Sequence, residues 1–368
     1  MSDVLTEVRG SVGFITLNRP RALNALSLPM VRDLSAALSA WAHDAAVAMV
    51  AIRGVNKEGP FGAFCAGGDI RFFHQAVLAG DPALEDFFTE EYTLNHLIHH
   101  YPKPYVAFLD GIVMGGGMGI SQGSKLRIVT ERTKMAMPET AIGLFPDVGG
   151  GYFLGRCPGH VGEYLALTGA TIGAQDALAA GLADVAVESA GLTQLWDALA
   201  AAPAATLERL QHLAATKSIA ENAPLVCTRG QIDHYFGLES VPAIVAALDA
   251  GSTPWAAETA AVLRKRSPLM LHVVLEQVRR GRSLALADDL RLERDMVHHC
   301  FHLRPGTAGE TMEGIRAVAV DKDHSPRWNP ARIEDVTQSM VAPFFTSPWT
   351  PQDHPLRGLG AASVAGPV

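Results

Sequence analysis

Two acidic residues lie in an otherwise apolar segment that glycines and prolines interrupt. In the stretch AMPETAIGLFPDVGGGYF, residues 136–153, they are Glu139 and Asp147. A carboxylate in apolar surroundings can work as a general acid, a general base or a nucleophile, because desolvation raises its pKa toward neutrality. Each acid is also explained as a loop or turn residue, since both follow a proline. From these residues alone the turn interpretation is favoured.

Two small-residue loops, each ahead of an expected helix, could present backbone donors to a ligand. The first contains CAGGD within residues 61–73, and the second is GGGMG, residues 115–119. N–H groups at a helix start stabilise a negative oxygen, because they are aligned with the helix dipole. Alone, each loop is better explained as a turn, with Asp69 as a helix N-cap in the first. Together they could supply the two donors of an oxyanion hole.

The histidines and cysteines indicate neither a metal site nor a cysteine nucleophile. The clusters HLIHH (residues 96–100) and HHCFH (residues 298–302) have no acid ligand at a suitable spacing, so we expect surface or core histidines and no bound metal. Cys65 has no base partner marked nearby, and we expect a small packed residue. The four cysteines form no CxxC pair, which favours a reducing compartment.

The elements that must position these residues alternate between strands and helices in the first half of the chain. Alternating or continuous apolar runs predict strands within residues 4–18 (a hairpin), 47–55, 104–117 and 125–131. Helical spacing predicts helices over residues 27–44 and 87–104, the second stopped by Pro102. The strand over residues 104–117 runs directly into the glycines. This alternation predicts an α/β fold with helices packed on a sheet.

After about residue 160 the strand signals become rare and helical spacing dominates. Thr171 is a candidate N-cap for a helix within residues 172–184, and Ser267 with Pro268 begins a helix that ends at Gly281. A further helix within residues 283–301 carries an apolar face made of Leu286, Leu290, Val297 and Phe301.

Composition limits the partners. The chain has 368 residues, of which 48% are hydrophobic and 18% charged, as in globular proteins. A formal net charge of −8 argues against nucleic-acid binding, because no basic field offsets phosphate repulsion. No apolar run approaches the length that spans a membrane, and the first residues lack the pattern of a signal or transit peptide. We therefore expect a cytoplasmic protein.

Several stretches resemble the crotonase (enoyl-CoA hydratase/isomerase) superfamily, and most closely its 3-hydroxyisobutyryl-CoA hydrolase branch. FGAFCAGGDI, PYVAFLDGIVMGGGMGI and RALNAL are similar to superfamily motifs, and EEYTLNH and YLALTG to the branch. The joint occurrence of PETAIGLFPDVGGGYFL with DKDHSPRWNP is more specific for the branch. The resemblance covers most of the chain. It implies an acyl-CoA thioester as a small-molecule substrate, so that CoA is part of the substrate and no separate cofactor is expected.

The resemblance also implies a fold and its division. We expect a crotonase (ClpP/crotonase-like) fold of repeated ββα units with a helical C-terminal region. Residues 1–200 would form the core with the acyl-CoA site, and residues 201–338 a mainly helical C-terminal region. Residues 339–368, rich in proline and glycine, would be a loosely held tail. Relatives of this kind are often trimers or hexamers, so a homo-oligomer is possible, although the helical region could cover that surface instead.

The resemblance assigns roles to particular residues. The N–H groups of Gly68 and Gly116 would form the oxyanion hole, Glu139 and Asp147 would act on the thioester, and Glu91 would be a further substrate contact. For Glu91, a solvated helix charge is nearly as good an interpretation. The residues implied to hold the CoA moiety are Arg21, Leu23, Ala66, Gly68, Asp69 and Ile70. Arg19 and Arg21 could meet the ADP phosphates, with a solvated surface role equally open for each.

One departure from the hydratase pattern is informative. Hydratases resembling this chain carry a glutamate at the position that matches Gly119, and they use it together with the glutamate that matches Glu139. Gly119 cannot act as an acid or a base. The position that matches Asp147 is usually glycine in those hydratases. One carboxylate is thus missing and another has appeared, as in the hydrolase branch.

The resemblance therefore implies hydrolysis of 3-hydroxyisobutyryl-CoA, or of a close 3-hydroxyacyl-CoA, to the free acid and CoA, as in valine degradation. Glu139 would activate water or attack the carbonyl itself to give a mixed anhydride. Asp147 would bind the 3-hydroxyl group, orient Glu139 or water, or help to protonate the leaving thiolate. Two alternatives stay open: an enoyl-CoA hydratase or isomerase, against which Gly119 counts, and a non-catalytic acyl-CoA-binding relative, against which both acids and both loops count.

Overall fold

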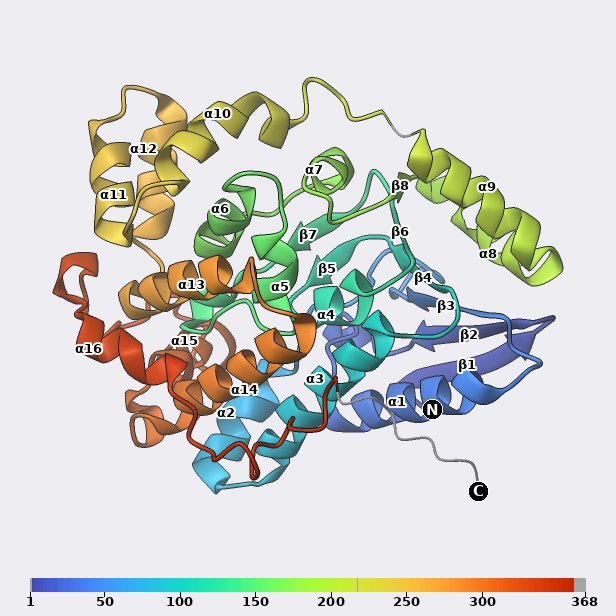
Figure 1. Ribbon diagram of the computed structural model, residues 1–368, viewed down its shortest axis with the longest axis horizontal. Coiled ribbons are helices and arrows are strands. Elements are labelled where there is room, and N and C mark those ends of the chain that lie inside the picture. The colour runs from blue at the N-terminus through green and yellow to red at the C-terminus, as the bar shows by residue number, and fades with distance from the viewer. Residues whose placement is uncertain (1, 217, 361–368) are drawn as a thin grey trace.

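A six-stranded sheet with one antiparallel edge organises the N-terminal half of the chain (Figure 1). The computed structural model describes residues 2–216 and 218–360. In the sheet β1 and β2 are antiparallel, as the hairpin prediction requires, and every further pair is parallel. The strand order is β1 (Val4–Arg9), β2 (Val12–Leu17), β3 (Met49–Gly54), β4 (Tyr105–Leu109), β6 (Leu126–Val129) and β8 (Val185–Ala186).

A second, two-stranded parallel sheet consists of β5 (Ile112–Met114) and β7 (Lys134–Ala136). The sequence predicted one strand over residues 104–117, but the structure divides it into β4 and β5. Gly111 makes the break possible, because its φ of +76° is left-handed and a Cβ there would lie 2.0 Å from the Gly62 carbonyl oxygen. The break turns β5 out of the large sheet and directs the glycine run away from it.

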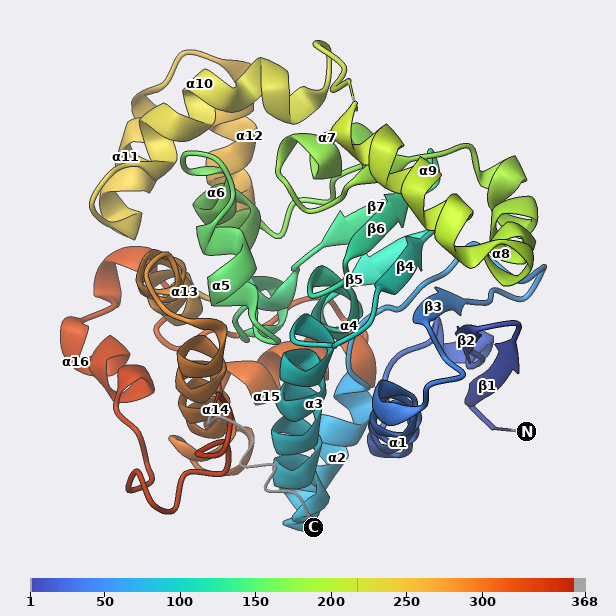
Figure 2. The same ribbon diagram turned by 45° about the vertical axis from the view of Figure 1, so that its right-hand side comes forward.

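Helices cover the sheet and then continue as a layered helical region (Figures 1 and 2). The helices of the first half are α1 (Leu28–His43), α2 (Ile70–Ala79), α3 (Ala83–His99), α4 (Gly116–Gln122), α5 (Gly150–Gly155), α6 (Val161–Thr168) and α7 (Ala174–Ala179). Those of the second half are α8 (Leu192–Ala201), α9 (Pro203–Ala215), α10 (Pro224–Phe236), α11 (Val241–Ala250), α12 (Pro254–Leu263), α13 (Pro268–Gly281), α14 (Leu286–His302), α15 (Glu310–Ile315) and α16 (Gln338–Val341). Short helical turns are η1 (Pro20–Ala22), η2 (Glu139–Ile142), η3 (Ser189–Gly191), η4 (Gly306–Ala308), η6 (Ile333–Asp335), η7 (Ala342–Phe345) and the π-helical η5 (Arg316–Val320).

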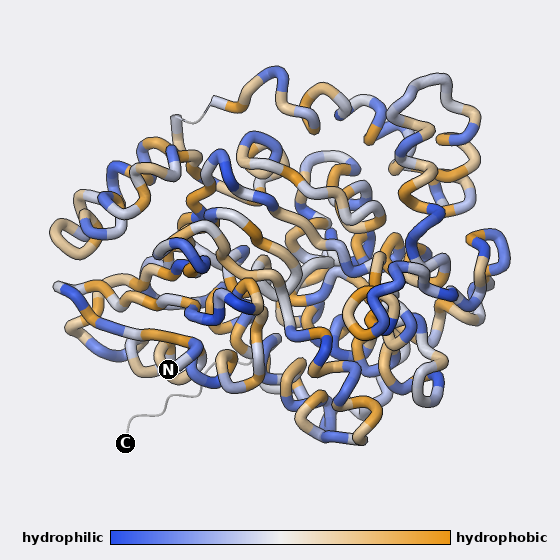
Figure 3. Tube along the Cα trace, turned by 180° about the vertical axis from the view of Figure 1, so that it is seen from behind, coloured by the Kyte–Doolittle hydropathy of each residue, from blue (hydrophilic) through white to orange (hydrophobic). Residues whose placement is uncertain are grey.

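The central strands β2, β3 and β4 are buried on both faces, whereas the edge strand β1 is largely exposed. Phe14 and Ile15, neighbours on β2, belong to two different apolar clusters because successive strand residues point to opposite faces. The smaller cluster lies under α8 and α9, where Trp196 packs 4.6 Å from the Phe14 ring. Apolar and polar residues alternate along these two outer helices, which bury only one side (Figure 3). The larger cluster holds α1, α3 and the helical region together.

The helix ends test the capping predictions. The Ser267 side chain accepts a hydrogen bond from Met270 N–H at the start of α13, and Asp69 accepts one from Phe72 N–H at the start of α2, so both N-cap predictions are confirmed. The prediction for Thr171 is wrong, because α7 begins only after Gly173. Ile172 instead pairs with Met135 as an extended bridge, which delays the helix.

The expectation of a loosely held tail is wrong for residues 339–360. Val341, Phe344 and Leu356 are at most 4% exposed, and η7 packs against α14. Apolar residues among the prolines thus anchor this segment, which lies along α14 (Figure 1). The rest of the predicted tail, residues 361–368, lies outside the described residues. Among the described residues, no helix has both the length and the apolar character needed to cross a membrane.

Candidate active site

The two glycine loops lie side by side. Cys65 N–H donates to the Ile112 carbonyl at 2.9 Å, and Met114 N–H donates to the Cys65 carbonyl at 2.9 Å, so the first loop runs along β5 like a further strand. Since β5 ends at Met114, the glycine run follows opposite the end of the first loop. A Cβ built on Gly67 would lie 3.5 Å from the Gly116 nitrogen. The backbone pairing thus brings the two loops into contact.

The N–H groups of Gly68 and Gly116 are close together and unpaired. A Cβ on Gly116 would lie 3.4 Å from the Gly68 nitrogen. Gly116 is the first residue of α4, where an N–H has no acceptor within the helix. Among the described residues, neither N–H has a hydrogen-bond acceptor. Both glycines line one cavity, so their free N–H groups are candidates for an oxyanion hole.

Three carboxyl groups line the same cavity, whose volume is about 270 Å³. Glu139 lies on η2 and Glu91 on α3, and Asp147 lies in the turn before α5. Glu91 is 2% exposed, and Glu139 and Asp147 are each 6% exposed. A solvated role for Glu91 is therefore wrong, and Asp147 is both a turn residue and a buried one.

The glycines are needed for this close approach. A Cβ on Gly115 would lie 2.8 Å from Glu139 Oε1, and a Cβ on Gly116 would lie 2.5 Å from Glu91 Oε1. Two carboxyl oxygens, Glu139 Oε2 and Glu91 Oε1, are buried without a hydrogen-bond partner in the part of the chain that the structure describes. Buried polar atoms are rarely left unpaired, so these oxygens mark a place where a ligand or water binds.

Burial raises the pKa of all three acids. The pKa values of Glu91 and Glu139 rise well above the ordinary glutamate value, first through desolvation and then through the charge of Asp147. Burial raises the pKa of Asp147 to about 6, although a hydrogen bond from Tyr92 acts to lower it. The Tyr92 hydroxyl donates to Asp147 Oδ2 at 2.8 Å. Asp147 can thus exchange a proton close to neutral pH, and the two glutamates hold their protons more tightly than a free glutamate does.

A strained backbone turns Asp147 toward the cavity. The next residue, Val148, has a φ of +57°, a left-handed conformation that costs a β-branched residue about 1–3 kcal/mol. Glu293 of α14 accepts hydrogen bonds from Gly149 N–H at 2.7 Å and Gly151 N–H at 3.0 Å. Gln277 of α13 donates to the Pro146 carbonyl at 2.6 Å. Two buried helices therefore hold both ends of the strained turn.

Val148 also closes the position of Gly119. A Cβ on Gly119 would lie 2.5 Å from the Val148 Cβ and 3.0 Å from Asn95 Nδ2. The space that a larger side chain at position 119 would need is therefore filled. The sequence has no carboxylate at position 119, and the packing around that position leaves no room for one.

Three of the six residues predicted to hold CoA are part of the wall of this cavity. Ala66, Gly68 and Ile70 line it. The Ala66 N–H donates to the Leu23 carbonyl at 3.0 Å, so the RALNAL turn adjoins the first glycine loop. Leu23 is 43% exposed although it is apolar, and Arg21 is also exposed.

Arg19 and Asp69, two charged residues of this region, form an ion pair with each other. The Arg19 guanidinium binds Asp69 at 2.9 Å and the Ala25 carbonyl at 3.0 Å. Arg19 is therefore less free to meet a phosphate than Arg21, for which no such partner is found among the described residues. Asp69 acts here as an N-cap and an ion-pair partner.

The cysteines behave as predicted. Cys65, Cys157, Cys227 and Cys300 are free. Cys65 is completely buried, and burial raises the pKa of its thiol to about 12. A thiol with that pKa remains protonated at neutral pH, which agrees with a packed residue rather than a nucleophile.

Sequence reasoning missed the residues that orient the acids, namely Tyr92, Val148, Gln277 and Glu293. A signal existed for Glu293, which falls between Leu290 and Val297 on the predicted apolar face of its helix. A glutamate on an apolar face must find buried partners. No local pattern could show that those partners are the N–H groups of Gly149 and Gly151, which lie 144 and 142 residues away in the sequence.

The fold and this site agree with the similarity of the chain to known proteins. A family model described as Enoyl-CoA hydratase/isomerase matches residues 12–345. The chain belongs to this family. The predicted superfamily and the crotonase-type fold are thereby confirmed.

Relatives with assigned names are similar over nearly the whole chain. The mitochondrial 3-hydroxyisobutyryl-CoA hydrolase of Gallus gallus is 40% identical over 94% of this chain and 89% of its own. The protein of the same name from Xenopus tropicalis is 42% identical with the same coverage. A crystal structure described as an enoyl-CoA hydratase from Rhodobacter sphaeroides 2.4.1 is 40% identical, covers 94% of this chain and 98% of that chain, and has a TM-score of 0.85.

Proposed function

We propose that this chain is an acyl-CoA thioester hydrolase that converts 3-hydroxyisobutyryl-CoA, or a close 3-hydroxyacyl-CoA, into the free acid and CoA. The observation that carries the proposal is the arrangement of the acids: Glu139 and Asp147 share a cavity with two unpaired N–H groups, while Val148 fills the place of a carboxylate at position 119. The names of the chicken and frog relatives support the same reaction.

The unpaired N–H groups account for stabilisation of the transition state. In thioester hydrolysis, negative charge develops on the carbonyl oxygen when a nucleophile adds to the carbon. The N–H groups of Gly68 and Gly116 would bind that oxygen, and loss of one such donor typically costs on the order of 10²–10³ in rate. These N–H groups are already unpaired and lie in the cavity wall, so they would need no rearrangement when negative charge develops on the carbonyl oxygen.

Glu139 is the proposed base or nucleophile. Its Oε1 lies against Gly115, next to the proposed oxyanion donors, and its Oε2 has no partner within the described residues. As a base it would take a proton from water that attacks the carbonyl. As a nucleophile it would form a mixed anhydride and release the CoA thiolate, and water would then hydrolyse the anhydride. Both routes consume one water and yield one acid and one thiol.

Asp147 and Glu91 are the proposed partners of Glu139. A carboxyl group with a pKa of about 6 can give a proton to the leaving thiolate and regain it from solvent, which suits Asp147. Burial, and after it the charges of Asp147 and Glu139, raise the pKa of Glu91, so that Glu91 keeps its proton when Glu139 is ionised and can donate a hydrogen bond. We propose that Glu91 binds the hydroxyl group of the acyl chain. The CoA moiety would lie near Arg21, Leu23, Ala66, Gly68, Asp69 and Ile70, and we propose no separate cofactor.

The second candidate is an enoyl-CoA hydratase or isomerase, because the Rhodobacter sphaeroides structure is described as a hydratase. Water addition to a double bond needs an acid and a base placed on the α and β carbons. Glu139 with Asp147 or Glu91 could in principle form such a pair, so the test must observe both reactions.

One assay separates these functions. The purified protein is given 3-hydroxyisobutyryl-CoA and, separately, crotonyl-CoA, while free thiol and double-bond absorbance are followed independently. We expect thiol release from the first substrate and no hydration of the second. Hydration without thiol release would instead favour the second candidate, and CoA binding without either reaction would favour a non-catalytic relative.

The cellular setting is also a proposal. We infer a role in valine degradation from the substrate. A cytoplasmic location stays a prediction, and the chicken and frog relatives are named as mitochondrial proteins. Assembly into a trimer or hexamer likewise stays a prediction, which sedimentation of the purified chain would test.

A further inference from the structure

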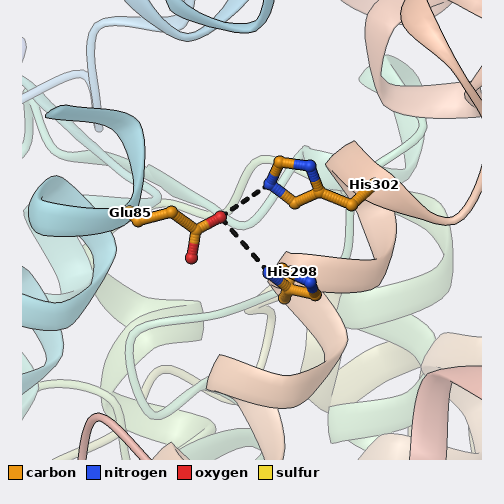
Figure 4. A group of neighbouring side chains, drawn as sticks. All are labelled: Glu85, His298 and His302. Atoms are coloured by element: carbon orange, nitrogen blue, oxygen red, sulfur yellow. Dashed lines mark hydrogen bonds and ion pairs between the residues drawn. The ribbon is translucent and has the colours of Figure 1, made fainter. Parts of the chain in front are cut away.

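A cluster of two histidines and one glutamate, none of which lines the cavity described above, joins α3 to α14 (Figure 4). His298 and His302 lie one turn apart on α14 and point toward Glu85 in the first turn of α3. The sequence carries no acid ligand at a suitable spacing from this histidine cluster, but the fold brings Glu85 to His298 across 213 residues of sequence. Folding thus supplies the acid that local spacing lacked.

The three ligand atoms lie close enough together to converge on one small metal ion. His302 Nε2 lies 2.7 Å and His298 Nδ1 lies 3.3 Å from Glu85 Oε1, and all three atoms lie within 4.8 Å of one another. In a tetrahedral zinc site with bonds of about 2.0–2.1 Å, neighbouring ligand atoms are about 3.3–3.4 Å apart. Small side-chain rotations therefore suffice to bring all three atoms onto one ion.

The carboxylate is already oriented for one-atom coordination. Arg294, which is 1% exposed, pairs with Glu85 Oε2 and also donates to Thr89 Oγ1 at 3.1 Å. This leaves Oε1 facing the imidazoles, in the way that second hydrogen-bond partners commonly orient metal-binding carboxylates. The cluster is open to solvent, because the His302 side chain is 44% exposed, so water can supply a fourth ligand.

The charges around the cluster limit the strength of binding. The Arg294 guanidinium repels a cation, whereas Glu85 attracts it, and the imidazoles bind a metal only when they are neutral. We therefore expect an exchangeable ion rather than one retained through purification.

We propose that Glu85, His298 and His302 bind a divalent transition-metal ion, preferably Zn²⁺, which links α3 to α14. Two imidazoles and one carboxylate form a donor set that suits zinc. Among the described residues, this is the one group of three such side chains whose ligand atoms converge. An ion held between the two helices would stabilise the folded chain, because the ligands are apart in the unfolded chain.

A second histidine pair provides a matched control. His96 and His100 on α3 are also one turn apart, with ring centroids 4.2 Å from each other. Among the described residues, no carboxylate converges with this pair as Glu85 does with His298 and His302. His100→Ala thus removes one exposed histidine of a pair without touching the proposed site.

The test uses full-length, metal-free protein without a polyhistidine tag, and Zn²⁺ alone as the probe in isothermal titration. We expect one Zn²⁺ per chain in the wild type and in His100→Ala. In His298→Ala and in His302→Ala we expect affinity to fall by about 10–100-fold or more, since even loss of an outer hydrogen-bond partner typically costs that much. Zn²⁺ should raise the thermal unfolding midpoint of the wild type and His100→Ala but not of His302→Ala.

An independent optical signal comes from Trp349, whose ring centroid lies 4.8 Å from that of His298. Co²⁺ at the proposed site should quench Trp349 fluorescence, excess Zn²⁺ should reverse the quenching, and Trp349→Phe should abolish the signal. The proposal is overturned if the wild type binds no Zn²⁺, or if His302→Ala binds it as tightly as the wild type. Because His302 is largely exposed, that variant is expected to fold, which its metal-free unfolding midpoint verifies.

Discussion

At the residue scale, the three acids of the cavity behave as one coupled group. Glu91, Glu139 and Asp147 each lose solvation, and the Asp147 charge raises the pKa values of the two glutamates further. The Tyr92 hydroxyl is the one neighbouring side chain that donates to Asp147 within the described residues. It therefore separates Asp147 from the glutamates by keeping its pKa near 6. Different pKa values allow neighbouring acids to take different roles.

The first prediction concerns this hydrogen bond. Tyr92→Phe removes a donor that lowers the pKa of Asp147, so that pKa should rise above about 6. The limb of the pH profile of kcat/KM that reports Asp147 should move to higher pH by about one pH unit. Tyr105→Phe, which removes another buried hydroxyl bonded to the Ile120 carbonyl, is the control and should leave the profile in place. An unchanged pH profile in Tyr92→Phe would show that Tyr92 does not lower the pKa of the group that titrates.

The second prediction concerns stability. Because burial raises the pKa of Glu139, the folded chain binds this proton more tightly than the unfolded chain does. Stability therefore falls as pH rises from the ordinary glutamate value of 4.5 through the raised pKa. Glu139→Gln removes this loss and should raise the unfolding midpoint more at about pH 8 than at about pH 5. Equal effects at both pH values would contradict the raised pKa.

Individual residues were predictable where they carry a chemical pattern. Glu139 and Asp147 stand out as acids in an apolar segment, but only the resemblance to the crotonase superfamily favoured a functional role over a turn. The burial of Glu91 was indicated by its spacing, because Glu91 lies on the same helical face as Leu84 and Ile98, which are buried. Tyr92 shows no such signal, because a tyrosine on a helix looks the same whether or not it orients an acid.

At the element scale, the turn before α5 decides which chemistry the site supports. Val148 adopts a left-handed φ and fills the space beside Gly119 on α4. The same turn directs Asp147 toward Tyr92. The left-handed conformation of Val148 thus accounts both for the direction of the Asp147 carboxylate and for the filled space beside Gly119.

The third prediction tests this coupling. Gly119→Glu should lower the unfolding free energy by about 1–3 kcal/mol or more, because it forces a side chain into filled space. In a Val148→Gly background the same substitution should cost less, since the nearest atoms of the clash are gone and glycine accepts the left-handed φ. Chemical denaturation of the two single variants and the double variant measures the difference. Additive effects would show that Val148 does not close the position.

Elements with strong periodicity were predicted well, and their breaks were not. The apolar face of α14 and the Ser267 cap could be read directly, because spacing and capping are local. The division of β4 from β5 depends on the contact between Gly111 and Gly62, which no local pattern contains. For the same reason, the sequence indicated two glycine loops but not that backbone pairing joins them.

At the scale of the whole molecule, the C-terminal region is part of the site. α13 and α14 hold the turn that carries Asp147 through Gln277 and Glu293, and residues 339–360 cover the outer side of α14. Stability of the C-terminal segment is therefore linked to the geometry of the cavity, although the two lie far apart in the sequence.

The fourth prediction measures this anchoring. Phe344 is 4% exposed, and Phe344→Ala should lower the unfolding free energy by about 3–5 kcal/mol. Phe345, which is only half-buried beneath the Arg280 guanidinium, is the matched control and should lose clearly less on substitution by alanine. Urea unfolding compares the two variants. A loss no larger than that of Phe345→Ala would restore the expectation of a loosely held tail.

The overall architecture was predictable in class but not in its long-range contacts. Alternating strands and helices followed by helices alone indicated a sheet core with a helical region. The meeting of Glu293 with Gly149, and of Glu85 with His302, joins residues 144 and 217 positions apart. Such contacts result from packing of the complete chain, which local spacing does not encode.

The most direct test of the proposed hydrolase is the rate of thiol release from 3-hydroxyisobutyryl-CoA by Glu139→Gln, measured beside the affinity for CoA. We predict that kcat falls by about 10²–10⁴-fold, as for the loss of a general base, while CoA binds with unchanged affinity. Glu131→Gln, at an exposed position, should keep the full rate. An undiminished rate of thiol release in Glu139→Gln would contradict the account.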